Sequence, residues 1–112
     1  MIPRDYRLPA GKYVEIRANG VVFQGRWLAI SMVKNGLDDK SRFGIITSTR
    51  ISKRAVLRNW VKRIIRDYVM QKIDSIAKGW DIVILTKKEI SKRTVNDIQK
   101  DLQSLLEVSN LI

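Results

Sequence analysis

The chain has 112 residues, a length typical of one domain, and 45% of them are hydrophobic, enough for a core without metals or disulfides. Lysine and arginine number 22 against 11 aspartates and glutamates, so the net charge is +11 and the isoelectric point is about 10.4. This surplus of cations predicts a polyanionic partner, either nucleic acid or an anionic membrane surface. Cysteine and histidine are absent, which excludes disulfides, zinc ribbons, thiol nucleophiles and Ser-His triads.

Membrane insertion and secretion also find no support in the sequence. The longest purely apolar run, Ile82 to Leu85, is far shorter than the ~20 residues that a membrane helix needs. The first residues lack the apolar region of a signal peptide. We therefore expect a soluble, cytoplasmic protein.

The N-terminal third predicts a short helix followed by a strand. The helix is expected over residues 9–18, with a proline in its first turn and the pair Asn19-Gly20 ending it. Residues 21–33 are rich in β-branched and aromatic side chains. They predict one strand, with a bulge near Gly25.

A turn and a returning strand are expected next. The Asn35-Gly36 pair is typical of a hairpin turn, and residues 42–48 predict the returning strand. Residues 51–52 predict a short third strand or a loop.

The second half predicts two amphipathic helices around a buried strand. The most periodic segment covers residues 53–78 and predicts a long helix that Gly79 stops. The apolar run 80–86 predicts a buried strand. Thr94 with Asp97 resembles a capping box, and the apolar residues that follow recur at helical spacing. The predicted order is α-β-β-(β)-α-β-α.

The position of the positive charge indicates its use. Between Lys40 and Arg66 there are nine basic residues and no acidic one. At ~100° per residue, one i, i+4 row on the long helix contains Arg54, Arg58, Lys62 and Arg66, with Asn59 and Arg63 beside it. A merely solvated face usually mixes glutamate with lysine, and a membrane-surface helix keeps an apolar face for lipid. The row therefore favours a phosphate-binding surface.

Catalytic groups are not grouped in the sequence. The pair Asp38-Asp39 is the only adjacent pair of acids and falls in a turn, whereas Asp67 reads as a local ion-pair partner. We predict no catalytic residue and no metal ligand, and hence a binder. Tyr13 can either stack on an unpaired base or lie half-buried in the core, and the sequence leaves both open.

Three segments resemble the bacterial ribonuclease P protein component. The stretch 43–66, FGIITSTRISKRAVLRNWVKRIIR, is similar to the family's G-[IL]-S-V-S-K-K and R-N-R-[VI]-K-R-x-x-R motifs. The opening IPRDYRL at 2–8 is similar to the family's L-P-x-x-x-R-L, and GWDIVI at 79–84 to its last strand. The resemblance covers nearly the whole chain as a single domain, 1–112.

The resemblance implies a fold and a division of labour. It implies an α+β two-layer sandwich similar to the second domain of ribosomal protein S5, with a left-handed βαβ crossover through the long helix. The enzyme is a ribonucleoprotein that removes the 5′ leader from precursor tRNA. Its RNA subunit is the catalyst, and Mg²⁺ is bound mainly by that RNA and the substrate. The protein binds ribonuclease P RNA and precursor tRNA, as a monomer 1:1 with the RNA, and raises substrate and Mg²⁺ affinity.

The resemblance also assigns residues to two sites. Contact with the RNA subunit is implied for Arg50, Lys53, Arg54, Arg58, Asn59, Lys62, Arg63 and Arg66. Contact with the single-stranded leader is implied for Tyr13, Arg17, Ala29, Ser31, Ile46 and Ser48. Two positions depart from the family pattern. Arg17 replaces the second aromatic of the first helix, and Trp60 replaces the third residue of R-N-R, on the apolar side of the helix.

Two other functions fit the same composition. One is a general or ribosome-associated RNA-binding module without a role in tRNA 5′ processing, whose binding would ignore the leader. The other is a free-standing nuclease, which would cleave RNA without an RNA subunit.

Overall fold

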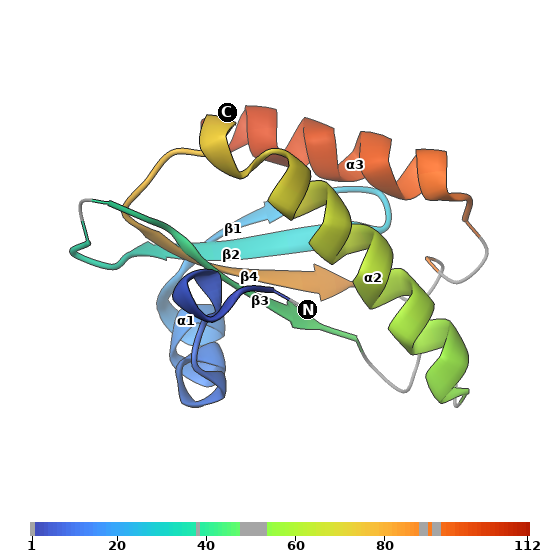
Figure 1. Ribbon diagram of the computed structural model, residues 1–112, viewed down its shortest axis with the longest axis horizontal. Coiled ribbons are helices and arrows are strands. Elements are labelled where there is room, and N and C mark those ends of the chain that lie inside the picture. Colours follow the sequence, from blue (N-terminus) through green and yellow to red (C-terminus); the bar gives the residue numbers. More distant parts are fainter. Residues whose placement is uncertain (1, 38, 48–53, 88–89, 91–92) are drawn as a thin grey trace.

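The computed structural model describes residues 2–37, 39–47, 54–87, 90 and 93–112 (Figure 1). Within them, one sheet has the order β1-β2-β4-β3 and consists of β1 (Val21–Gln24), β2 (Leu28–Lys34), β3 (Arg42–Ile46) and β4 (Trp80–Thr86). The α-helices are α1 (Tyr13–Asn19), α2 (Ala55–Gln71) and α3 (Val95–Val108). Short 3-10 helices are η1 (Arg4–Tyr6) and η2 (Ala10–Lys12) before α1, and η3 (Ile73–Ser75) after α2.

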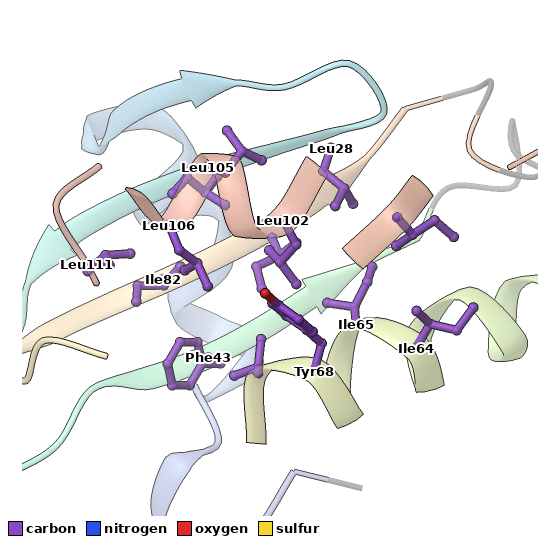
Figure 2. Close-up of a cluster of buried hydrophobic side chains, with 14 of the residues drawn as sticks. Leu28, Phe43, Ile64, Ile65, Tyr68, Ile82, Leu102, Leu105, Leu106 and Leu111 are labelled. Atoms are coloured by element: carbon purple, nitrogen blue, oxygen red, sulfur yellow. The ribbon is translucent and has the colours of Figure 1, made fainter. Parts of the chain in front are cut away.

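The helices cover both faces of the sheet. Helices α2 and α3 pack on one face and α1 on the other (Figure 1). Because successive side chains of a strand point to opposite faces, Ile82 joins the large core beneath α2 and α3, whereas Val83 joins a smaller cluster with Ile16 of α1. Figure 2 shows side chains from the strands, α2 and α3 meeting in the large core, with Phe43 and Leu102 fully buried. The predicted α+β class is confirmed.

The single strand predicted over residues 21–33 is wrong, because this segment is a hairpin. β1 and β2 pair antiparallel, with Gln24 opposite Ala29. The turn between them is closed by the Gly25 N–H, which donates to the Leu28 carbonyl at 2.8 Å. The predicted bulge at Gly25 is therefore a chain reversal, which the carboxylate of Asp101 on α3 holds in place.

The hairpin predicted at Asn35-Gly36 is also wrong in its pairing. The chain does turn there, with Gly36 at φ 77°, but β4 lies between β2 and β3. β4 is antiparallel to β2 and parallel to β3. It is apolar on both faces, and a central position between two strands is the arrangement that buries both. The left-handedness of the β3–α2–β4 crossover stays a prediction.

Asp81 fixes the ends of these three strands. Its carboxylate, 3% exposed, accepts from Arg42 Nε at 2.8 Å and Nη2 at 2.7 Å, and from Asn35 Nδ2 at 3.2 Å. The hydrogen bond to Asp81 raises the pKa of Arg42, against the opposing effect of burial. Arg42 thus serves the fold, although the sequence counts it within the acid-free basic stretch.

The long helix is shorter than predicted. α2 ends at Gln71 rather than near residue 78, and η3 follows. Ile76, 4% exposed, reaches the core from this non-helical segment, so apolar spacing persists after the helix has ended. The Ala77 N–H donates to the Leu111 carbonyl at 2.6 Å, and Gly79 at φ 93° turns the chain into β4.

The remaining elements lie where the sequence predicts them. β4 covers residues 80–86, and the helix predicted over 9–18 is present as η2 and α1. α3 begins with the predicted capping box, in which the Asp97 N–H donates to Thr94 Oγ1 at 3.1 Å and the Thr94 N–H donates to Asp97 at 3.3 Å. Residues 51–52 lie outside the described residues.

Candidate nucleic-acid interface

The basic row lies on the face of α2 that points away from the core. The opposite face buries Val61, Ile65 and Val69, each 0% exposed. The row consists of Arg54, Arg58, Lys62 and Arg66, flanked by Asn59 and Arg63. All of them are exposed except Arg58 and Arg66, which are partly buried. The predicted grouping of these side chains on one face is therefore present, whereas Arg50 and Lys53 lie outside the described residues.

Two side chains beside the row behave as the sequence indicates. Asp67 forms an ion pair with Arg66, with 3.2 Å between Oδ1 and Nε, in the local role predicted for it. Trp60 is partly buried and packs against the large core, as its place on the apolar side of the helix predicts. The side chain of Trp60 therefore belongs to the apolar side of α2 and not to its basic face.

Tyr13 begins α1 and lies directly on β3. A Cβ atom added to Gly44 would come within 2.4 Å of Cζ of the tyrosine ring, so the ring occupies the space that glycine leaves. Tyr13 is half-buried and packs against the smaller core cluster. Burial raises the pKa of its phenol, against smaller lowering effects from a hydrogen bond with the Ile45 backbone and from the charge of Arg7. The half-buried position is the second of the two possibilities left open for Tyr13, and stacking on an unpaired base stays a prediction.

The other residues assigned to leader binding differ in accessibility. Arg17 is exposed on α1, one turn after Tyr13, and Ile46 is partly buried in the cluster beneath α1. Ser31 is 1% exposed, and its Oγ donates to the Ile16 carbonyl at 2.7 Å. Ala29, on the same face of β2, is 7% exposed. Ser31 therefore holds α1 on the sheet, and Ser48 lies outside the described residues.

A cleft of about 280 Å³ joins the two predicted sites. Its lining includes Tyr13 from the predicted leader site and Lys62 and Arg66 from the basic row. The remaining walls come from the N-terminal segment and β3, namely Ile2, Arg7, Phe43, Gly44 and Ile45. The sequence assigned no role to Arg7 or Gly44, although both stand in the motifs that carry the resemblance.

A larger polar cleft of about 730 Å³ lies between the β1–β2 turn and α3. Its centre is Asp101, 8% exposed, whose carboxylate accepts the backbone N–H groups of Arg26, Trp27 and Leu28 at 2.9, 3.0 and 2.9 Å. These three hydrogen bonds tie the β1–β2 turn to α3, which is a structural role. No pattern in the sequence marks Asp101, since it is a single acid on a helix.

The described residues include no group of three or more His, Cys, Asp or Glu side chains that could hold a metal ion. No helix among them has the length and apolar character needed to cross a membrane. What the structure does bring together is cations, the ring of Tyr13 and an apolar floor. Such a combination binds phosphates and an unstacked base.

Comparison with known proteins gives a consistent result. Residues 2–109 match the family described as Ribonuclease P. The ribonuclease P protein component of Fusobacterium nucleatum is 34% identical in an alignment 106 residues long that covers 91% of this chain and 94% of the relative.

Solved structures agree with the family match. The RNase P protein of Staphylococcus aureus superposes with a TM-score of 0.87 at 26% identity, covering 95% of this chain and 96% of that one. The RNase P protein of Thermotoga maritima gives a TM-score of 0.82 at 28% identity, covering 91% and 96%.

Proposed function

The chain belongs to the ribonuclease P protein family, the subunit of an RNA-based tRNA-processing endoribonuclease that leaves the chemistry to the RNA, and we propose how its two surfaces divide the binding. The basic face of α2 binds ribonuclease P RNA. The α1 face of the sheet, with Tyr13 and Arg17, binds the single-stranded 5′ leader of precursor tRNA. The observation that carries this proposal is the cleft in which Tyr13 and the basic row meet.

Binding on the α2 face follows from electrostatics. Lysine and arginine side chains that neutralise phosphates release condensed counterions, and the affinity then falls steeply with salt. No acidic residue occurs between positions 40 and 66, and the next acid, Asp67, forms only an exposed ion pair with Arg66. The row of like charges costs an isolated helix a few tenths of a kcal/mol per pair, and bound phosphates remove that repulsion.

The leader site works through stacking and shape. An unpaired base has a π-face that can lie on an aromatic ring, which gives affinity with little sequence preference. The Arg17 guanidinium, one turn after Tyr13, can stack on a base and also meet a phosphate. Holding the leader on the protein raises the affinity for substrate, and Mg²⁺ is bound mainly by the RNA subunit and the substrate. The complex contains one protein per RNA and works in the cytoplasm.

The leader site is tested by replacing Tyr13 with alanine. We expect the holoenzyme to lose about 1–3 kcal/mol of affinity for precursor tRNA with a leader of several nucleotides, because a stacking ring is gone. Equilibrium binding of substrates with long and one-nucleotide leaders measures this. Val14→Ala, an exposed neighbour on the same helix, is the matched control.

The loss is expected to be confined to the long leader, and Tyr13→Phe should retain most of the affinity. An unchanged preference for the long leader in Tyr13→Ala would remove Tyr13 from the site. An absence of any leader dependence in the parent would instead favour a general RNA-binding module.

A further inference from the structure

We infer that the cleft between α1 and α2 holds one unpaired nucleotide of the leader, with its base beside Tyr13 and its phosphate between Lys62 and Arg66. This inference rests on the proposed function and adds to it. Lys62 and Arg66, which the family resemblance places in the RNA-subunit interface, become substrate contacts. The basic row is then divided along α2 between two RNAs.

The size and lining of the cleft fit a single nucleotide. Its volume of about 280 Å³ is near the lower end of the range, about 300–1,000 Å³, of small-ligand pockets, and it cannot admit a duplex. Ile45, partly exposed above the buried Ile2 and Phe43, supplies an apolar wall, which suits a base and not a phosphate. Two of the three cations, Lys62 and Arg66, lie on the α2 side, whereas Tyr13 lies on the α1 side with Arg7 of the N-terminal segment near it.

The three cations that line the cleft have different roles. Arg7 Nη2 donates to the Ile2 carbonyl at 3.1 Å, which holds the N-terminal segment as a wall. Arg66 uses Nε on the exposed carboxylate of Asp67, and its terminal nitrogens remain as further donors for a phosphate. An exposed ion pair of this kind contributes little, so Asp67 competes weakly with a phosphate. Lys62, one turn earlier and exposed, completes the pair of phosphate ligands.

Gly44 is the positioning residue of this subsite. A Cβ atom there would lie 2.4 Å from Cζ, 2.5 Å from Cε1 and 2.5 Å from the phenolic oxygen of Tyr13. Even alanine would therefore displace the ring from its place against β3. The glycine lets β3 support one side of the ring and so fixes where a base can stack.

Tyr13 of α1 favours the leader over the RNA subunit as the source of the nucleotide, because the α1 face is the proposed leader site. The Leu8 N–H donates to the Phe43 carbonyl at 2.9 Å and the Leu8 side chain packs with Ile16, so the N-terminal wall is tied to β3 and to α1. Arg54, which precedes α2, and Arg63 on α2 are by contrast exposed and do not line the cleft.

The test is an abasic scan of the leader with the reconstituted holoenzyme. Precursor tRNAs that lack one leader base at a time are bound to the parent and to Gly44→Ala, Lys62→Gln and Arg66→Gln. We expect one position at which loss of the base costs the parent about 5- to 100-fold in affinity and costs Gly44→Ala almost nothing. Gly11→Ala is the matched control, since nothing lies within 4 Å of a Cβ there.

The charge variants test the phosphate contact separately. Lys62→Gln and Arg66→Gln should each lower the salt slope of substrate binding by about 0.7, only for leaders that reach that position. Lys100→Gln on α3 is the charge-matched control. Reduced affinity for the isolated RNA subunit, with the leader scan unchanged, would overturn the inference and return both residues to the RNA interface.

The proposed leader site and the nucleotide subsite are contradicted by different results. If parent affinity does not depend on leader length, the proposed leader site is wrong. If it does depend on length but no position couples to Gly44, Lys62 or Arg66, only the subsite is wrong. Should Gly44→Ala fail to fold, the two glutamine variants, which alter exposed or partly exposed side chains, still decide the matter.

Discussion

Replacing Arg54, Arg58 and Arg63 with glutamine is expected to weaken binding to ribonuclease P RNA by about 100-fold at 0.15 M salt. Each phosphate contact contributes about 0.7–0.9 to the slope of log affinity against log salt, so three lost contacts lower the slope by about 2–3. The difference from the parent should shrink with rising salt and vanish near 1 M. Filter binding or fluorescence anisotropy over a salt series measures both quantities.

The control for this variant carries the same change in net charge. Arg26, Lys78 and Lys100 are exposed cations outside the basic row, and their replacement with glutamine should change the affinity by only a few-fold. Glutamine has a good helix propensity and relieves like-charge repulsion along α2, so we expect the helix to be retained. Equal losses in the two triple variants would mean that total charge, not this face, drives binding.

Replacing Asp101 with alanine is expected to lower the free energy of unfolding by about 3–4 kcal/mol. A hydrogen bond to a charged acceptor contributes about 1.5–3 kcal/mol, and three backbone N–H groups of the β1–β2 turn lose theirs together. Water entering through the adjacent cleft recovers part of the loss. Because domains of this size have only about 5–15 kcal/mol in all, the variant should be conspicuously unstable in urea.

Two variants separate the carboxylate's role from a general effect of removing an acid. Asp101→Asn keeps the shape and one acceptor oxygen and should be intermediate. Asp74→Ala, at an exposed position of η3, should stay within about 0.5 kcal/mol of the parent. A loss below 1 kcal/mol in Asp101→Ala, measured by circular dichroism during urea unfolding, would show that the turn does not depend on α3.

Local patterns in the sequence predicted the helices and the basic face well. The capping box at Thr94 and Asp97 and the periodicity of α2 are short-range features, because every group involved lies within one or two turns. The same holds for the i, i+4 row that begins at Arg54. Its place on the outer face follows from the apolar side chains on the other side of α2.

These local patterns do not predict which strands pair when they lie far apart in the sequence. A turn at Gly36 predicts that strands reverse there, but not that β4, some 40 residues later, enters between β2 and β3. The bulge predicted at Gly25 is a turn instead. The prediction was wrong because Asp101, which completes the turn, lies on α3, far away in the sequence.

Local patterns also do not predict which residues of the candidate site meet in the cleft. The family resemblance assigned Tyr13 and Lys62 to separate sites, on two helices far apart in the chain. Their meeting in one cleft depends on Gly44, which removes the side chain between the ring of Tyr13 and β3. Only the packing of α1 on the sheet reveals that contact.

The most direct test of the central claim is single-turnover cleavage of 5′-labelled precursor tRNA at low Mg²⁺, with the protein alone, ribonuclease P RNA alone, and both together. The account predicts cleavage at the mature 5′ end only when both are present, because the RNA carries the chemistry and the protein supplies the affinity for RNA and leader. Failure of the combination would contradict the role as a subunit. Cleavage by the protein alone would contradict the assignment of the chemistry to the RNA.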